Sequence, residues 1–263
     1  MLKPVVEELS LRTIDPTASV ENPSLLGSGT RVRAGARISG DVETGEDALI
    51  DSNAVISGPV KLGKRTYIGP NSVIGFPDSA QLGELMRSGK VAAKPLTILG
   101  ENCVVRAGTS IYTDVKIAND VLFGHNVLVR EGVTIGEHTK LGTNVVIDGK
   151  STIRSRVSVQ TGVYICTYST VEDAVLLGPC CVFTNDKYVA QKPFKLIGPT
   201  VKKGASIGAN ALLFPGIIVG EGAVVGAQAM VNSDIPPRTI FAGIPARKIA
   251  DVPKDWRSSL LRI

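Results

Sequence analysis

The chain is poor in aromatic residues, histidine and cysteine, and each shortage excludes a class of protein. Aromatic residues make up 5% of the 263 positions, and there are two histidines and four cysteines. The cysteines stand singly or side by side, without C-x-x-C spacing, so neither a disulfide framework nor a structural metal cluster is expected. We therefore expect no metal cofactor.

Long apolar runs and basic runs interleaved with aromatic residues are also missing. The absence of an apolar stretch of membrane length and of a signal-like start predicts a cytoplasmic protein without a membrane partner. The absence of basic and aromatic residues in alternation argues against nucleic acid as a partner. The net charge of +5 is modest and dispersed, which suits small anionic ligands such as nucleotides.

What the sequence does have is a bulky apolar residue at every sixth position. This period fits neither an α-helix nor a plain strand and is typical of a hexapeptide solenoid. Two positions earlier lies a smaller or β-branched residue, so each unit places two side chains inward from one short strand. The pattern runs from Val20 to Ile74 with one break at Thr44, from Leu99 to Phe183 without a break, and from Val201 to Val231.

The position three residues after each large aliphatic falls in a turn and is often Gly, Asn or Asp, which tolerate a positive φ. Three strands and three turns close one coil, so the sequence predicts an all-β protein, a left-handed parallel β-helix of about ten coils. The expected positive-φ positions are Gly29, Gly35, Asp41, Asn53, Asn71, Asn102, Gly108, Asp114, Asp120, Asn126, Gly132, Asn144, Gly162, Asn210, Gly216 and Gly222.

Two inserted loops interrupt the repeat, at about residues 76–97 and 185–199. Counting strands in threes places both on one corner of the prism, where they form a lid, meet a neighbouring subunit or are tolerated surface insertions. We expect residues 1–250 to form one β-helix domain and residues 251–263 a C-terminal helical tail. Trp256, Leu260 and Leu261 would form the apolar face of that helix.

Three segments near the end of the repeat carry a family likeness. The motifs I-G-A-N-A at residues 207–211, V-G-A-Q-A at 225–229 and A-G-I-P-A-R-K at 242–248 resemble the left-handed β-helix acyltransferases that use acetyl-CoA. The stretch E-D-A-V-L-L-G-P-C-C-V-F-T-N-D-K-Y at residues 172–188 resembles the subgroup that N-acetylates amino groups on nucleotide-linked sugars. Together the likeness covers about residues 99–250.

The resemblance implies a homotrimer with active sites in the grooves between neighbouring prisms and acetyl-CoA as co-substrate. Small residues let the backbone approach an extended ligand, and phosphates need fixed cations. The residues expected to contact CoA are Gly208, Ala209, Gly226 and Ala227 along its pantetheine arm and Arg247 and Lys248 at its phosphates. The other reading of Arg247 and Lys248 is a solvated basic segment.

Three relatives on the same fold require histidines that this chain lacks. Sugar O-acetyltransferases carry a catalytic histidine in a loop like residues 184–199, and the acyltransferase that starts lipid A synthesis has an A-H-x-x-H-D run. A γ-class carbonic anhydrase needs three histidine ligands, whereas the histidines here are His125 and His138.

Acetyl transfer to an amine needs a neutral nucleophile and a route for the departing proton, and imidazole suits both. His125 lies in a turn and is a candidate catalytic base, and Asn126 beside it is a candidate for orienting the acceptor. His138 lies on another corner, so the two histidines should not share a site within one chain. The alternative reading of each histidine is an exposed turn residue.

Asn185, Asp186 and Lys187 begin the second loop. Asp186 is a candidate base or ammonium ligand, and Asn185 and Lys187 are candidates for binding the acceptor; the alternative is an Asx turn that starts the loop. His125 and Asp186 should be about 16 Å apart along the prism, so at most one is the base. Arg130 and Asp148 should stack as a structural ion pair.

These residues favour an acetyl-CoA-dependent N-acetyltransferase acting on a small-molecule amino sugar that is linked to a nucleotide. The runner-up is an acyltransferase with another acceptor, either a sugar hydroxyl or an amino-acid-derived amine. A non-catalytic β-helix scaffold and a metal-dependent lyase are the rivals from other classes. The intact A-G-I-P-A-R-K block argues against the first and the histidine count against the second.

Overall fold

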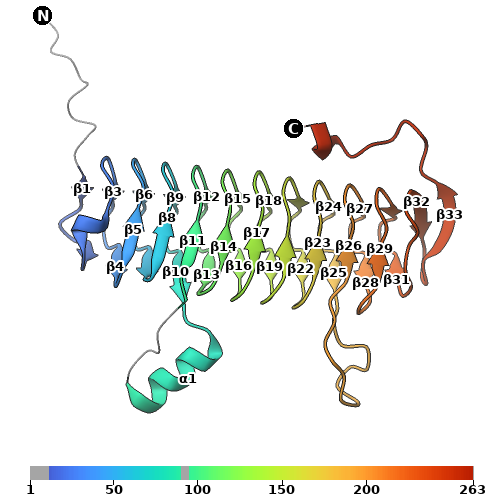
Figure 1. Cartoon of the computed structure of the whole chain (residues 1–263), viewed down its shortest axis with the longest axis horizontal. Coiled ribbons are helices and arrows are strands. Elements are labelled where there is room, and N and C mark those ends of the chain that lie inside the picture. Colours follow the sequence, from blue (N-terminus) through green and yellow to red (C-terminus); the bar gives the residue numbers. More distant parts are fainter. Residues whose placement is uncertain (1–11, 90–94, 263) are drawn as a thin grey trace, which may run out of the picture.

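The computed structural model describes residues 12–89 and 95–262, which wind into one long parallel β-helix (Figure 1). Three parallel sheets form its faces, and consecutive strands pass from the first sheet to the second, then to the third, before starting the next coil. The predicted β-helix is therefore confirmed. Residues 1–11 of the predicted domain lie outside the described residues.

The first sheet has 13 strands. They are β1 (Thr13–Ile14), β3 (Arg31–Val32), β6 (Leu49–Ile50), β9 (Tyr67–Ile68), β12 (Val104–Val105), β15 (Leu122–Phe123), β18 (Lys140–Leu141), β21 (Ser158–Val159), β24 (Leu176–Leu177), β27 (Ser206–Ile207), β30 (Val224–Val225), β32 (Thr239–Ala242) and β33 (Arg247–Asp251).

The second sheet has 11 strands and the third has nine. The second sheet contains β2 (Ser19–Val20), β4 (Arg37–Ser39), β7 (Val55–Ser57), β10 (Val73–Phe76), β13 (Ser110–Tyr112), β16 (Leu128–Val129), β19 (Val146–Ile147), β22 (Tyr164–Ile165), β25 (Val182–Phe183), β28 (Leu212–Leu213) and β31 (Met230–Val231). The third contains β5 (Val42–Thr44), β8 (Val60–Leu62), β11 (Thr97–Leu99), β14 (Lys116–Ile117), β17 (Thr134–Ile135), β20 (Thr152–Ile153), β23 (Thr170–Val171), β26 (Thr200–Val201) and β29 (Ile218–Val219).

The six-residue period sets the core, because the second residue of most strands points inward. Phe123 and Phe183 are fully buried, and the Val, Ile and Leu residues at the same repeat position are buried with them. Thr44, the one exception to the apolar pattern, is also buried, and its hydroxyl lies 2.9 Å from that of Thr30. A hydrogen bond therefore replaces apolar contact at that position.

The turns follow the prediction with one error. All the expected positions have positive φ except Asp41, where Gly40 takes this conformation with φ 70°. The same turn position holds residues that rarely adopt it, including Arg65, His138 and Tyr168. The stacked geometry of the coils therefore imposes the left-handed conformation even where no glycine or asparagine is present.

The β-helix has more coils than the predicted ten. Twelve parallel strands of the first sheet succeed one another, and β33 pairs antiparallel with β32. The first coil begins at Thr13, and Ile235 still bridges Val219, so the repeat continues through the proline-rich segment to β32. At the start, Ile14 lies six residues before Val20 and fits the pattern, but the count began at Val20. At the end, Ile235 lies four residues after Val231, so the last strands depart from the six-residue pattern.

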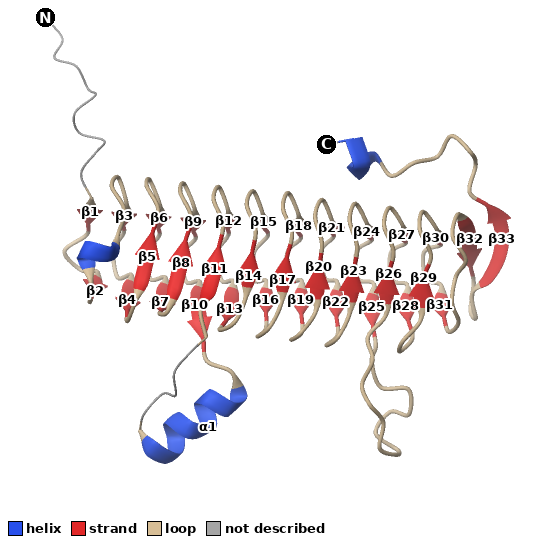
Figure 2. Ribbon diagram, in the orientation of Figure 1, coloured by secondary structure: helices blue, strands red, loops and turns tan. Residues whose placement is uncertain are grey.

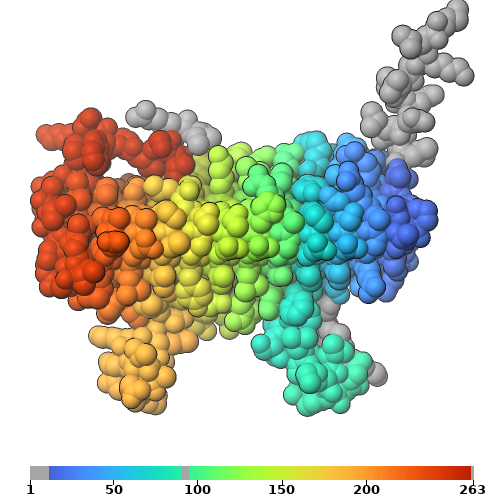
Figure 3. All heavy atoms as spheres, turned by 180° about the vertical axis from the view of Figure 1, so that it is seen from behind, coloured from blue at the N-terminus to red at the C-terminus, as the bar shows by residue number. Residues whose placement is uncertain are grey.

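Both inserted segments leave the second corner, between the second and third sheets, as predicted (Figures 1 and 3). The first follows β10 and contains α1 (Ser79–Ser88), which the sequence analysis did not predict. Asp78 caps α1 in a capping box with Gln81, and Gly89 ends it with φ 68°. The second, residues 184–199, follows β25 and is drawn as a loop in Figure 2.

After β33 the chain folds back along the third corner, between the third and first sheets (Figure 2). We call residues 253–262 the C-terminal strap. The predicted helical tail is present only as the 3-10 helix η3 (Ser259–Arg262), and Trp256 lies outside it. Another 3-10 helix, η2 (Pro23–Leu25), lies near the start of the described residues. Within the described residues, no helix is long and apolar enough to cross a bilayer.

Candidate active site

One line of stacked turns contains both His125 and the predicted CoA-binding residues, with β15 and β27 four positions apart in the first sheet, about 19 Å at the usual strand spacing. The register from β15 to β30 places the second turn residue of each coil directly above that of the previous coil on the first corner, between the first and second sheets. We call this line the donor edge. Its residues are His125, Thr143, Thr161, Pro179, Ala209 and Ala227.

The backbone N–H groups of Ala209 and Ala227 are free to bind a ligand. At two other turns the next coil supplies an acceptor at this position: Asn119 Oδ1 lies 2.9 Å from Glu101 N, and Asp173 Oδ1 lies 3.0 Å from Ser155 N. In the part of the chain that the structure describes, the N–H groups of Thr143 and Thr161 on the donor edge also have no acceptor. The residue after Ala209 in the line is Ala227, whose side chain offers no oxygen. Among the described residues, neither alanine N–H has a hydrogen-bond acceptor.

Gly208 and Gly226 have a structural reason to be glycine. A Cβ on Gly208 would lie 2.4 Å from Ala227 N, and one on Gly226 would lie 2.8 Å from Ala242 Cβ. Both distances are shorter than van der Waals contact allows. These glycines therefore let the coils stack at the donor edge, and any contact with CoA stays a prediction.

Arg247 and Lys248 lie beyond the C-terminal end of the donor edge. Arg247 pairs with Ala242 and Lys248 with Phe241 in the β32 and β33 hairpin, and both are exposed. Arg247 Nη1 donates to the carbonyl of Ala246 at 2.9 Å, and Lys248 Nζ lies 2.7 Å from an exposed carboxylate of Asp251. Their position continues the donor edge, which is compatible with phosphate binding there.

His125 and Asn126 are exposed at the other end of the donor edge. The backbone carbonyl of His125 accepts from Asn144 N at 2.9 Å, and Asn126 has a φ of 54°. His138 lies on the third corner, 3.8 Å from Asp120 Oδ2. The two histidines therefore lie on different corners, as expected from their spacing.

The side chains of Asn185 and Asp186, at the start of the second loop, form hydrogen bonds with backbone groups of the protein. Asp186 Oδ1 accepts from Tyr188 N at 2.8 Å and Oδ2 from Ala190 N at 2.7 Å, and these bonds lower the pKa of Asp186. Asn185 Nδ2 donates to the carbonyl of Thr167 at 3.3 Å. A carboxylate with a lowered pKa is a weak base, so this geometry favours loop formation over proton transfer.

The loop is separated from His125 both along and around the prism. Asn185 to Lys187 begin at the second corner, whereas His125 lies at the first. The strand after His125, β16, and the strand before the loop, β25, are three positions apart in the second sheet, about 14 Å at the usual strand spacing. Lys187 is exposed.

The predicted pair of Arg130 and Asp148 is confirmed, with Nη1 3.6 Å from Oδ1. Arg130 also contacts Glu131 at 3.1 Å, and Tyr164 donates to Asp148 Oδ2 at 2.6 Å. Burial and this hydrogen bond raise the pKa of Tyr164. The cluster lies between the two inserted segments, and its groups satisfy one another.

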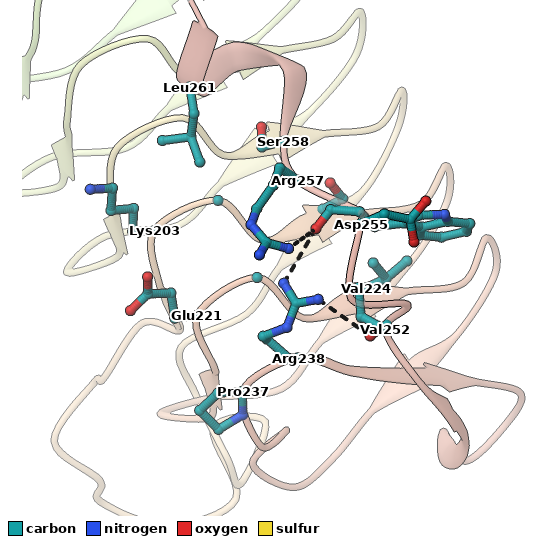
Figure 4. Close-up of a pocket in the computed structure, with 14 residues that line it drawn as sticks. Lys203, Glu221, Val224, Pro237, Arg238, Val252, Asp255, Arg257, Ser258 and Leu261 are labelled. Carbon is teal, nitrogen blue, oxygen red and sulfur yellow. Dashed lines mark hydrogen bonds between the residues drawn. The ribbon is translucent and has the colours of Figure 1, made fainter.

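The sequence analysis missed a cavity of about 640 Å³ beneath the C-terminal strap. Figure 4 shows Arg238 and Arg257 extending toward each other inside it. Arg238 occupies the same turn position as Gly204 and Gly222 in the preceding coils. The signal in the sequence is an arginine three residues after Ile235, where the two preceding coils have glycine.

The fold and this arrangement define a hexapeptide-repeat β-helix with one corner suited to an extended ligand. The family "Bacterial transferase hexapeptide (six repeats)" matches residues 41–75 and 114–149, and "Hexapeptide repeat of succinyl-transferase" matches residues 97–113 and 203–232. These matches confirm the resemblance to hexapeptide-repeat transferases.

The chain is also similar to individual acetyltransferases. It is 55% identical over 47 residues to a dTDP-3-amino-3,6-dideoxy-alpha-D-galactopyranose 3-N-acetyltransferase of Aneurinibacillus thermoaerophilus, covering 18% of this chain and 24% of that protein. It is 28% identical over 89 residues to the galactoside O-acetyltransferase of Escherichia coli, covering 32% and 44%. The chain thus spans less than half the length of these curated relatives.

Among solved structures, the chain is similar to the UDP-N-acetylglucosamine acyltransferase from Campylobacter jejuni. The TM-score is 0.47 and the identity 13%, covering 91% of this chain and 75% of that one.

Proposed function

We propose that the protein is an acetyl-CoA-dependent N-acetyltransferase that acts on a nucleotide-linked amino sugar. The observation that carries this proposal is the donor edge, which places His125 on the same corner as backbone N–H groups that have no acceptor among the described residues, those of Ala209 and Ala227 included. The local 55% identity to an amino-sugar 3-N-acetyltransferase supports the acceptor class.

In this proposal acetyl-CoA lies along the first corner. Its phosphates meet Arg247 and Lys248, its pantetheine carbonyls accept from Ala209 and Ala227, and its thioester points toward His125. Fixed cations and free N–H groups supply the contacts that such a ligand needs.

The reaction is a direct transfer in a ternary complex. The acceptor amine attacks the thioester carbonyl, the C–N bond forms, the C–S bond breaks and CoA leaves as the thiolate. His125 accepts the proton that the nitrogen loses. Asn126 orients the acceptor beside it.

The second loop binds the distant part of the acceptor. Asn185 and Lys187 supply polar contacts to the nucleotide sugar, and Asp186 fixes the loop through its two backbone hydrogen bonds. The separation of about 14 Å between loop and histidine is compatible with one long ligand that reaches both.

The second sheet supports assembly as a homotrimer, because its outward face is apolar along most of its length. Outward residues of the third sheet are instead mainly Thr and Lys, as in β14, β17 and β20. An extended apolar face indicates a protein partner, and a second copy has a face of matching length. The outward apolar residues are Val55, Val73, Leu128, Val146, Tyr164, Val182, Leu212 and Met230.

Turnover tests the activity directly. Release of free thiol from acetyl-CoA should require an amino sugar linked to a nucleotide, and mass spectrometry should show acetylation at nitrogen. The hydroxyl analogue of the same sugar nucleotide and free amino acids are the controls. Release with the hydroxyl analogue alone would show O-acetylation, and no release with any acceptor would contradict the proposed activity.

A matched pair of variants tests the assembly. Light scattering should give a trimer mass for the wild type and a smaller mass for Val146→Lys, which places a charge on the second sheet. Thr152→Lys places the same charge on the third sheet of the same coil and should leave the trimer intact. Equal masses for the two variants would exclude the second sheet as the interface.

A further inference from the structure

The cavity beneath the C-terminal strap is lined by cationic side chains. Its floor includes Gly204 and Gly222, which have positive φ and no side chain, and Ser206 and Val224 of the first sheet. The strap closes the opposite side. A volume of about 640 Å³ falls in the range of sites for small organic ligands.

Two guanidinium groups converge in this cavity on one carbonyl oxygen. Arg238 Nη1 and Arg257 Nη1 both donate to the carbonyl oxygen of Trp256, at 3.3 Å and 2.7 Å. Arg238 Nη2 donates to the carbonyls of Val252 and Pro253 at 3.3 Å and 2.7 Å. Among the described residues, neither guanidinium has a carboxylate within 4.0 Å.

Like charges held side by side favour a bound anion, and planar guanidinium groups match phosphate oxygens in particular. Lys203 adds a third cation to the lining, and Glu221 and Asp255 are the two carboxylates there. The side chains of the lining therefore carry a net positive charge.

An aromatic ring lies beside the cations. Trp256 lines the cavity and is 53% exposed, so one part of its ring remains available for stacking. Cations for phosphate groups beside an aromatic ring for stacking match the two parts of a nucleotide, its phosphates and its base.

We propose that this cavity binds a nucleoside diphosphate, with its phosphates on Arg238 and Arg257 and its base against Trp256. The site is separate from the proposed acetyl-CoA site. Lys203 and Gly204 precede β27 at the third corner, whereas Gly208 and Ala209 follow it at the first, so a strand of the first sheet lies between the two sites.

Trp256 is the single tryptophan of the chain, so its fluorescence reports on the cavity directly. Titration of the full chain with ADP should change this fluorescence in a saturable way, with one ADP per chain. Inorganic pyrophosphate should compete with ADP, whereas adenosine alone should bind much more weakly. Higher salt should weaken ADP binding, because the cations face solvent on one side.

Arg257→Gln should weaken ADP binding by about 10-fold or more. Lys254→Gln is the matched control, since it removes a positive charge from the same strap but does not line the cavity. Trp256→Phe, followed by calorimetry, should retain ADP binding because a ring is kept. Amide exchange of the strap in each variant shows whether the strap remains in place.

Three outcomes would overturn the proposal. The first is no saturable signal with ADP or pyrophosphate at millimolar concentration. The second is an equal effect of Arg257→Gln and Lys254→Gln. The third is a loss of acetyl-CoA affinity in Arg257→Gln as large as the loss for ADP, which would make the cavity part of the donor site. Binding of ADP requires no turnover, so these outcomes do not depend on the proposed transferase activity.

Discussion

Replacing Ala227 with proline tests the donor edge at the level of single backbone atoms. Proline removes the N–H that we assign to the pantetheine arm while leaving the turn able to form. The chain itself shows this tolerance, because Pro70 and Pro179 occupy the same turn position after a glycine. Ala227 and Ala209 also follow a glycine.

The expected loss is that of one hydrogen bond between an N–H and a ligand carbonyl. This is worth about 1 kcal/mol, so the Kd for acetyl-CoA should rise about 5-fold in Ala227→Pro and roughly 30-fold when Ala209→Pro is added. The melting temperature should stay the same or rise slightly, since proline restricts the unfolded chain.

Calorimetry of acetyl-CoA binding measures the effect, with Ala227→Gly as the control because it keeps the N–H and places no oxygen beside Ala209 N. The acceptor KM should not change in any of these variants. A proline variant that is folded as the wild type and binds acetyl-CoA with unchanged Kd would refute the assigned role of the donor edge.

Three further variants probe the remaining residues. His125→Asn should lower kcat by about 10²- to 10⁴-fold with acetyl-CoA binding intact, and a nearly unchanged kcat would leave proton loss to the substrate or solvent. Replacing Arg247 and Lys248 with Ala should weaken acetyl-CoA binding by about 1 to 3 kcal/mol in a salt-sensitive way, whereas unchanged affinity would show a solvated segment. The pKa of Asp186 is lowered from its ordinary value of 3.8. The hydrogen bonds from its carboxylate to the loop should therefore be fully present above pH 3.8 and be lost as the pH falls through the lowered pKa. Exchange of the Ala190 amide measures this, and a pH-independent rate, or equal rates in Asp186→Asn and wild type, would contradict it.

The sequence predicted the fold well because one period controls both core and turns. A large aliphatic at every sixth position defines the inward side of each strand, and the register follows once the coils stack. The segments that left this pattern were predicted poorly. The capping box of Asp78 and Gln81 marks the start of α1 and Gly89 marks its end, but these residues lie outside the repeat. Strand β33 is exposed at every residue, so no alternation marked it.

The donor edge follows from the sequence only if strands are counted instead of residues. Thirty residues separate Leu176 from Ser206, which pair in neighbouring coils, whereas eighteen separate Ser158 from Leu176. The difference is the second loop, whose twelve extra residues lie outside the stack. A count of strands instead of residues keeps the register across this loop, because the repeat resumes at Val201, and it places His125 and Ala209 on the same corner.

The stacked turns also explain how an edge gains binding groups without weakening the core. A turn N–H is satisfied when the next coil supplies an oxygen, as Asn119 does for Glu101. Where the next coil supplies no oxygen, as at Ala209 beneath Ala227, the N–H has no acceptor among the described residues. In Ala227→Asn, the new Oδ1 should accept from Ala209 N as Asn119 Oδ1 does from Glu101 N, because the turn geometry is the same. The fold should gain up to about 1 kcal/mol, while acetyl-CoA should bind about 5-fold more weakly. Urea unfolding and calorimetry measure the two changes together. If the variant bound acetyl-CoA like the wild type although it was more stable, the Ala209 N–H would have no role in donor binding.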